Sequence, residues 1–345
     1  MIENEGIRAE DARSCLLCGG EGSLLHDGLR DRLFDAPGVW SLMQCPKCKL
    51  VWLNPQPIPE DITKLYAQYF THYKLKEEKR PLNGLRKSVT ASVLKSNLGY
   101  NVDSPNRILV SMLSRIGPLR EIAESNVMWL KASENGRLLD IGCGNGSFLT
   151  KMRQLGWSVV GVEPDEKAVS IAREKLGLEI FQGSLEEAEF PEGYFDAITM
   201  NHVIEHVLDP IGLLKECHRV LRPGGELIVV TPNIRSLGQH IFRENWRGYE
   251  VPRHLFLFVP EALRICAERS GLVVKELKTS ASLARWMWIT SRLIKRDDKL
   301  PGGSPEMQDL LLRLEGLTFQ AIEYGLGGRR VTGEELALIA TKKVL

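Results

Sequence analysis

The fold is decided by the stretch Asp140-Ile141-Gly142-Cys143-Gly144-Asn145-Gly146. A short apolar run over 138–141 leads into it, and an amphipathic helical pattern over 147–155 follows it. Glycine at every second position lets backbone N–H groups approach a ligand closely, because no side chain stands in the way. The segment therefore predicts a ligand-binding turn between a strand and a helix.

Apolar runs and helical patterns alternate on both sides of this turn. We predict seven strands, over 138–141, 159–162, 178–181, 195–200, 227–230, 272–277 and 335–341. Helices are expected between them, over 147–155, 166–176, 211–221 and 261–270. This alternation indicates an α/β fold, with a mostly parallel sheet covered by helices on both faces.

Two insertions interrupt the alternation, over 234–259 and 281–333. The first leaves the carboxyl end of a predicted parallel strand, which is where such sheets bind their ligands. We therefore expect the segment 234–259 to cap the ligand crevice.

The spacing of the glycines separates two families that use such turns. Dinucleotide-binding folds have G-x-G-x-x-G, but the third glycine position, counted from Gly142, holds Ser147. Glycine at alternate positions after an acidic residue instead resembles the D/E-x-G-x-G-x-G motif of class I S-adenosylmethionine (SAM)-dependent methyltransferases. Glu163 ends the next predicted strand, where a carboxylate can accept hydrogen bonds from both ribose hydroxyls.

Other segments strengthen the resemblance, which covers about 132–280 and 334–345. They are the strand Phe195-Asp196-Ala197-Ile198, the turn predicted over 221–225, and the two late strands, which suit the edge hairpin of this family. The resemblance implies a Rossmann-like methyltransferase domain that binds SAM.

The resemblance also implies which residues bind SAM. Asp140 and the glycines Gly142, Gly144 and Gly146 line its methionine side, and Glu163 holds the ribose. Many relatives contact adenine with an Asp after the third strand, whereas this chain has Gln182-Gly183-Ser184-Leu185. We assign that contact to Ser184 or to backbone groups. Asn201, after the fourth strand, completes the predicted set.

Two CxxC pairs lie near the N-terminus, Cys15/Cys18 and Cys45/Cys48. Four thiolates brought together by a hairpin would form a closed tetrahedral zinc site without an open position for catalysis. Few large apolar side chains are expected to pack in this module, so a structural Zn²⁺ would supply folding energy. Free thiols and a rubredoxin-like iron are the alternatives. The remaining cysteines are scattered, which argues against a disulfide framework.

Three parts follow from these patterns. The segment 1–56 is the predicted zinc-binding module, and the proline-rich run 54–59 marks its end. Apolar residues at three- and four-residue spacing predict a helical linker over 57–131. The methyltransferase domain is expected over 132–345.

The candidates for proton removal are histidines. His202-Val203-Ile204-Glu205-His206 follows the fourth strand, beside the expected methyl group, and His202, Glu205 and His206 would share one face of a helix. His254 lies in the first insertion. A hydroxyl or carbon acceptor must lose a proton, so we predict His206 and His254 as bases, with Glu205 and His202 as further catalytic residues. A packing role suits any one of these histidines equally well.

Three neighbours of His254 are secondary candidates. Tyr249 and Glu250 carry groups that can exchange protons, and Arg253 could hold an acceptor phosphate.

Two subfamilies suggest acceptors. Ubiquinone-pathway O-methyltransferases have a similar E-x-x-E-H segment that can hold a divalent metal, but here His202 replaces its first acid. The layout of two CxxC pairs before the domain resembles sugar-modifying methyltransferases. These include deoxysugar C-methyltransferases with a His after strand four and a Glu-His in the cap, where this chain has Glu205-His206 and Arg253-His254.

We therefore predict methylation of a glycan, nucleotide-sugar or lipid-linked saccharide, with O-transfer ahead of C-transfer. One alternative is a quinone-type phenol O-methyltransferase, in which Trp286 and Trp288 line an apolar pocket; a core position in the insertion is the reading we favour for both. Another is an inactive SAM-fold protein whose zinc module docks a partner.

The net charge of +1 conceals an uneven distribution. Residues 137–234 carry 9 Lys/Arg and 15 Asp/Glu, whereas 64–131 and 235–296 each carry 12 Lys/Arg and 5 Asp/Glu. The basic segments are either solvated helix faces or the frame of an anionic acceptor. No nucleic-acid recognition motif accompanies them.

No secretion signal and no apolar stretch of membrane-spanning length is visible in the sequence. We therefore expect a cytoplasmic protein. Peripheral contact with a membrane and the oligomeric state stay open.

Overall fold

The computed structural model describes residues 1–66, 83–103, 108–133, 135–300, 309–326 and 332–344. The chain falls into two compact units that interleave in sequence. The first comprises 1–70, 202–215 and 229–338, and the second comprises 71–201, 216–228 and 339–345. Parts of the predicted helical linker (67–82 and 104–107) and of the second insertion (301–308 and 327–331) lie outside the described residues.

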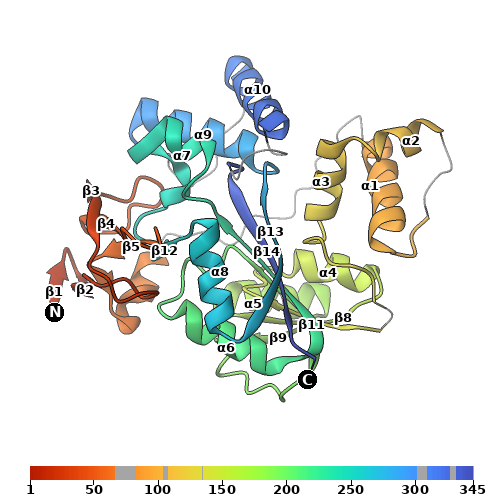
Figure 1. The fold of residues 1–345 in the computed structure, drawn as a ribbon, viewed down its shortest axis with the longest axis horizontal. Helices are drawn as coiled ribbons and strands as arrows, with labels where there is room; N and C mark the ends of the chain where they lie inside the picture. Colours follow the sequence, from red (N-terminus) through yellow and green to blue (C-terminus); the bar gives the residue numbers. More distant parts are fainter. Residues whose placement is uncertain (67–82, 104–107, 134, 301–308, 327–331, 345) are drawn as a thin grey trace. The chain divides into compact units, whose positions relative to one another are not determined.

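A seven-stranded sheet has the strand order β13-β14-β11-β10-β7-β8-β9 (Figure 1). Its strands are β7 (Arg137–Ile141), β8 (Ser158–Glu163), β9 (Glu179–Gln182), β10 (Phe195–Asn201), β11 (Leu221–Pro232), β13 (Leu272–Ser280) and β14 (Glu335–Lys342). The pairs β10–β7, β7–β8 and β8–β9 are parallel. The predicted mostly parallel α/β sheet is confirmed.

One predicted boundary is wrong. The segment 221–225, expected to be a turn, is the start of β11. A side chain at Gly225 would place its Cβ 2.9 Å from the carbonyl oxygen of Asp196, so glycine here permits close approach of two backbones. The carbonyl of Gly225 also accepts a hydrogen bond from the Thr341 hydroxyl.

Helices of the second unit follow the predicted pattern. They are α1 (Asn83–Leu98), α2 (Ile108–Leu113), α3 (Gly117–Ser125), α4 (Ser147–Gln154) and α5 (Glu166–Leu176), whereas α6 (Pro210–Val220) spans both units. Local chemistry sets the ends of α5: the Asp165 carboxylate accepts from the N–H groups of Lys167 and Ala168, and Gly177 closes the helix in the left-handed conformation.

The N-terminal segment (residues 1–57) supplies all strands but one of two small antiparallel sheets, both in the first unit. One has the order β1-β2-β6 and the other β12-β5-β4-β3. Their strands are β1 (Ile2–Asn4), β2 (Ile7–Glu10), β3 (Ser23–Leu29), β4 (Trp40–Gln44), β5 (Val51–Asn54), β6 (Gln56–Pro57) and β12 (Phe256–Leu257). The strand β12 belongs to the first insertion, so that insertion completes a sheet of the N-terminal segment.

The expectation that this module has few large apolar side chains to pack is wrong. Trp40 and Trp52 are fully buried, as are Leu42, Leu50 and Leu53. Burying such side chains stabilises a fold by about 1.5–3 kcal/mol each. The segment therefore has an apolar core in addition to its cysteines.

The two insertions and the connecting segments are mainly helical. Their elements are α7 (Leu237–Phe242), α8 (Pro260–Arg269), α9 (Ala284–Asp297), α10 (Leu310–Leu326) and the 3-10 helices η1 (Pro59–Tyr66), η2 (Arg243–Asn245) and η3 (Arg247–Tyr249). Trp288 of α9 packs against Phe242 and Phe319, with ring centroids 5.0 and 4.6 Å apart. Within the described chain, no helix has the length and apolar character needed to span a bilayer.

Candidate functional site

The glycine turn lies in the second unit and depends on its left-handed backbone. Gly142, Gly144 and Gly146 have φ values of +69°, +53° and +78°. A Cβ at Gly144 would meet no atom within 4 Å, whereas one at Gly146 would lie 2.4 Å from Cδ1 of Leu178. Gly144 thus borders open space, and Gly146 permits close packing of the turn.

Glu163 braces this turn. Its Oε2 accepts a hydrogen bond from the Gly144 N–H at 2.8 Å, and its Oε1 accepts one from the Asp165 N–H at 3.0 Å. Burial raises the pKa of Glu163, and these hydrogen bonds oppose that rise. The sequence predicted the carboxylate but not its contact with Gly144, which follows from the pairing of β7 with β8.

Asp140 is buried at the end of β7, opposite Thr199 of β10. The Thr199 hydroxyl donates to its Oδ1 at 2.7 Å. Burial raises the pKa of Asp140 to about 7, although the hydroxyl hydrogen bond lowers it. Thr199 was not among the predicted residues, because nothing local in its strand marks it.

The other two predicted SAM residues are exposed. The hydroxyl of Ser184 accepts from the Glu187 N–H at 3.2 Å, and the Ser184 N–H donates to the Glu187 carboxylate. Asn201 is the last residue of β10. Their roles in binding SAM stay predictions.

The histidines lie in the first unit, and the segment 202–206 is a turn, not the helix on which a shared face was predicted. His202 has a left-handed φ of +54°. Its Nδ1 lies 3.1 Å from Oε1 of Glu205, and its Nε2 lies 2.9 Å from Oε1 of Glu335. Burial opposes a charge on His202, but the two carboxylates raise its pKa to about 10. The imidazolium therefore donates from both nitrogens.

Glu205 is fully buried beneath this turn. Its Oε2 accepts from the Thr231 hydroxyl at 2.9 Å. Burial would raise the pKa of Glu205, but the hydrogen bond and charge of His202 lower it to about 2. The carboxylate is thus ionised and already paired.

His206 and His254 lie side by side although they are far apart in the sequence. Their rings meet edge to face, with centroids 4.7 Å apart. Nδ1–H of His206 donates to the Arg253 carbonyl at 3.0 Å, and Nδ1–H of His254 donates to the Gly248 carbonyl at 2.8 Å. The Tyr66 hydroxyl, which sequence reasoning missed, lies 3.1 Å from Nδ1 of His206.

His254 is the more buried of this pair. Burial and the neighbouring His206 lower its pKa to about 4, so its ring is neutral at pH 7. Because its Nδ1 carries the proton, its Nε2 carries the lone pair. Glu205, His206 and His254 also place one potential metal-ligand atom each within 4.8 Å of one another.

A pocket of about 210 Å³ adjoins these groups. Its lining comprises His202, His206, Pro232, Arg247, Gly248, Glu250, His254, Leu283, Trp286, Met287, Glu334 and Glu335. Leu283, Trp286 and Met287 form an apolar wall at the start of α9. Trp286 thus lines a pocket, as the phenol alternative predicted, whereas Trp288 lies in the core of the insertion, as expected.

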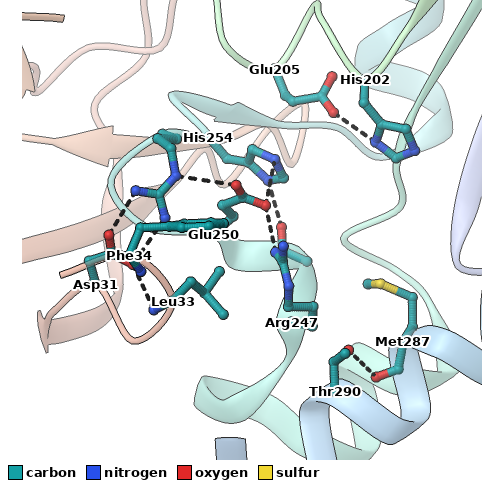
Figure 2. A network of polar contacts seen from close by, with 12 residues as sticks. Asp31, Leu33, Phe34, His202, Glu205, Arg247, Glu250, His254, Met287 and Thr290 are labelled. Atoms are coloured by element: carbon teal, nitrogen blue, oxygen red, sulfur yellow. Dashed lines mark hydrogen bonds and ion pairs between the residues drawn. The ribbon is translucent and has the colours of Figure 1, made fainter. Parts of the chain in front are cut away.

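Charged side chains beside the pocket are paired with one another. Glu250 forms an ion pair with Arg247, and Figure 2 shows it beside the neutral ring of His254, whose Nε2 lies 3.8 Å from Oε2 of Glu250. The guanidinium of Arg247 also lies over the Trp286 ring, 5.0 Å from its centroid. Tyr249 is buried, and its hydroxyl contacts His26 and Gln239. The two secondary candidates therefore differ: Glu250 lines the pocket and Tyr249 does not.

The suggestion that Arg253 holds an acceptor phosphate is wrong. Its side chain is fully buried and does not line the pocket. It donates two hydrogen bonds to Asp31, at 2.7 and 3.0 Å, and one to Glu250 at 3.2 Å. Because Asp31 and Glu250 already occupy the guanidinium of Arg253, it has no room for a phosphate.

The four N-terminal cysteines come together as the spacing predicted, with all four Sγ atoms within 4.8 Å of one another. The closest Sγ pairs are Cys15–Cys48 at 3.4 Å and Cys18–Cys45 at 3.3 Å. These distances are too long for disulfides, whose S–S bond is about 2.05 Å. Zinc bound tetrahedrally at about 2.3 Å separates its sulfurs by roughly 3.8 Å, so the donor set fits the ion.

The raised pKa of His202 makes the stability of this site depend on pH. The folded-state value of about 10 exceeds the ordinary value of 6.5, so its ion pairs stabilise fully below pH 6.5 and lose their effect as the pH rises through 10. We expect His202→Gln to lower the free energy of unfolding by about 2 kcal/mol near neutral pH. The difference from the unmodified protein should shrink above pH 10, which urea unfolding at both pH values measures.

The exposed His240 of α7 provides the control. His240→Gln should leave the unfolding free energy unchanged at either pH. A His202→Gln deficit that is the same at both pH values would contradict a charged His202.

Comparison with known proteins agrees with this architecture. A family model described as a methyltransferase domain matches residues 118–277. The ubiquinone biosynthesis O-methyltransferase of Pseudomonas aeruginosa (strain LESB58) is 35% identical over 180 residues, which cover 48% of this chain and 77% of that protein. The enzyme of the same name from Dinoroseobacter shibae is 32% identical over 43% of this chain and 67% of that protein.

Solved structures include a SAM-dependent methyltransferase from Thermotoga maritima, described as a possible histamine N-methyltransferase. It is 24% identical and is matched over 67% of this chain and 92% of its own, with a TM-score of 0.43. The curated relatives, together with the glycine turn at the end of β7, show the family of this chain. The chain belongs to the SAM-dependent methyltransferases.

Proposed function

We propose that this chain methylates a hydroxyl oxygen of a ring-shaped acceptor, which binds in the pocket lined by His206, His254 and Trp286. The observation that carries the proposal is the pair of histidines whose Nδ1–H groups are held by backbone carbonyls. In its neutral form, each ring then has its lone pair on Nε2 and can accept a proton from a hydroxyl.

Residues of the second unit fit SAM as the cofactor. Gly144 borders open space, as a backbone that approaches a ligand must, and Glu163 fixes the Gly144 N–H beside it. When bound, SAM supplies a methyl group on a sulfonium, which is already an excellent leaving group. The chain's own residues therefore need only align the acceptor and take up its proton.

The charge states of the histidines divide their roles. His202 is protonated at pH 7 and donates from both nitrogens, so it cannot accept a proton. His254 is neutral with its lone pair on Nε2. We therefore assign proton removal to His206 and His254, and to His202 the role of holding Glu205 and Glu335.

The pocket's lining favours a neutral acceptor ring. Arg247 is paired with Glu250 and His202 with Glu335, which leaves little charge to attract the anionic acceptor predicted from the basic segments. The apolar wall at Trp286 suits an aromatic ring. The relatives at 32–35% identity are named O-methyltransferases of ubiquinone biosynthesis, and this supports a phenolic hydroxyl.

A saccharide hydroxyl is the second candidate. The paired carboxylates of Glu250 and Glu335 line the same pocket, and each carboxylate oxygen can accept a further hydrogen bond from a sugar hydroxyl. Formation of S-adenosylhomocysteine with simple catechols, compared with nucleoside diphosphate sugars, separates the two acceptor classes. Turnover with either class excludes an inactive SAM-binding scaffold.

We also propose that Cys15, Cys18, Cys45 and Cys48 bind a structural zinc ion. The purified protein should contain about one zinc per chain. Cys48→Ser should remove the metal and lower the melting temperature, because a metal bound only by the folded module stabilises it. Elemental analysis and thermal melts measure both effects.

Cys266, buried in α8 away from this cluster, provides the matched control. Cys266→Ser should cost stability but retain the metal. Iron in place of zinc, or a Cys48→Ser variant with its full metal content, would contradict the assignment.

The cofactor assignment predicts a role for Glu163. Replacing it by Ala removes acceptors for the ribose hydroxyls and the brace on Gly144, so Glu163→Ala should weaken SAM binding by roughly 2–3 kcal/mol. Calorimetric titration with SAM measures this loss, which is about 30- to 150-fold in the dissociation constant. Glu174→Ala, on the exposed face of α5, should bind normally. Unchanged affinity of Glu163→Ala would remove the ribose assignment.

The base assignment predicts a different pattern. His206→Ala and His254→Ala should lower turnover by about 100-fold or more, while SAM affinity stays unchanged. His240→Ala should keep full activity. Full activity in both variants would exclude them as bases. Activity that a chelator abolishes and a divalent cation restores would assign Glu205, His206 and His254 as metal ligands instead.

A further inference from the structure

Asp31 of the N-terminal segment is buried within the first unit. Its side chain is fully buried and forms a two-point ion pair with Arg253, a residue 222 positions away. It also accepts hydrogen bonds from the N–H groups of Leu33, Phe34 and Ala36, so its own position is fixed by its loop. Figure 2 shows Asp31 beside the Phe34 loop.

The guanidinium of Arg253 contacts groups from several separate segments of the chain. Besides Asp31, its guanidinium donates to Oε1 of Glu250 at 3.2 Å and to the Leu65 carbonyl at 3.3 Å. It lies over the Phe34 ring, 4.5 Å from the centroid. Burial opposes the charge of Arg253, and the two carboxylates raise its pKa. The charge is therefore retained inside the fold.

The backbone of Arg253 meets the pocket. Its carbonyl accepts Nδ1–H of His206, and the next residue is His254. The following backbone is fixed as well: the Leu53 N–H of β5 donates to the Leu255 carbonyl, and the Leu255 N–H donates to the Glu205 carbonyl. The side chain of Arg253 thus contacts Asp31 of the N-terminal segment, whereas its backbone carbonyl contacts His206, a candidate base.

We propose that Asp31 is a positioning residue for His206: through its ion pair with Arg253, it holds the carbonyl that keeps the His206 proton on Nδ1 and the lone pair on Nε2. This inference rests on the proposed role of His206 as a base. It gives the cysteine-bearing segment a part in the chemistry, since that segment supplies Asp31 to the acceptor site.

The energetics of buried ion pairs support positioning over simple stabilisation. Removing two charges from water costs about as much as their attraction returns, so such a pair is weak evidence for stability. The segment already has an apolar core around Trp40 and Trp52. The pair instead fixes the orientation of Arg253, because two parallel hydrogen bonds hold the plane of its guanidinium.

The experiment uses Asp31→Asn in the full chain, which keeps the side-chain shape but removes the charge. We expect turnover to fall about tenfold or more while SAM affinity is unchanged. The ¹⁵N chemical shifts of the His206 ring should change from those of the Nδ1–H form to those of a tautomer mixture. This readout needs no acceptor, so it stays informative even if His206→Ala is fully active and the base assignment fails.

Asp61 is the matched control. Its carboxylate is buried in η1 of the same unit and forms a two-point pair with Arg8, at 2.8 and 3.2 Å. Asp61→Asn also breaks a two-point ion pair with an arginine but should leave the His206 tautomer and turnover unchanged. A conservative Asp31→Glu variant should recover part of the turnover that Asp31→Asn loses.

Three results would overturn the proposal: an unchanged His206 tautomer in Asp31→Asn, unchanged turnover there, or equal effects in Asp61→Asn. If Asp31→Asn does not fold, Arg253→Lys replaces it, because lysine keeps the charge but cannot form two parallel hydrogen bonds. The same change in the His206 tautomer is then expected, and its absence contradicts the proposal equally.

Discussion

Two backbone carbonyls, those of Gly248 and Arg253, set the chemistry of the candidate acceptor site. Each accepts the Nδ1–H of one histidine and so fixes which ring nitrogen carries the lone pair. A carbonyl can only accept, so each of these contacts favours the tautomer with the proton on Nδ1. The neutral state of His254 follows from its burial. The arrangement of the pocket therefore depends on how the segment from Gly248 to His254 is held.

Several parts of the first unit hold that segment. Glu250 forms ion pairs with both Arg247 and Arg253. Asp31 of the N-terminal segment forms a further ion pair with Arg253. The strand β12, just beyond His254, pairs with β5. The N-terminal segment is consequently part of the scaffold of the candidate acceptor site, and it also carries the four clustered cysteines.

The glycine turn is built on a different principle. Its shape comes from glycines in left-handed conformations, and its position from one carboxylate of the neighbouring strand. Parallel pairing of β7 and β8 brings Glu163 to Gly144 without any long-range ion pair. The geometry of this turn depends only on two neighbouring strands of the sheet. A local sequence motif is therefore enough to predict it.

The sequence by itself determined the strands and helices of the sheet domain, the glycine turn and the cysteine quartet. Each of these rests on local spacing: alternation of apolar runs, glycine at every second position, or two CxxC pairs. The tertiary structure alone decided that His206 meets His254, that Arg253 is buried against Asp31 and excluded from the pocket, and that His202 is held by Glu335. These partners lie far apart in the chain, and burial and pairing of charges arise only when the elements pack.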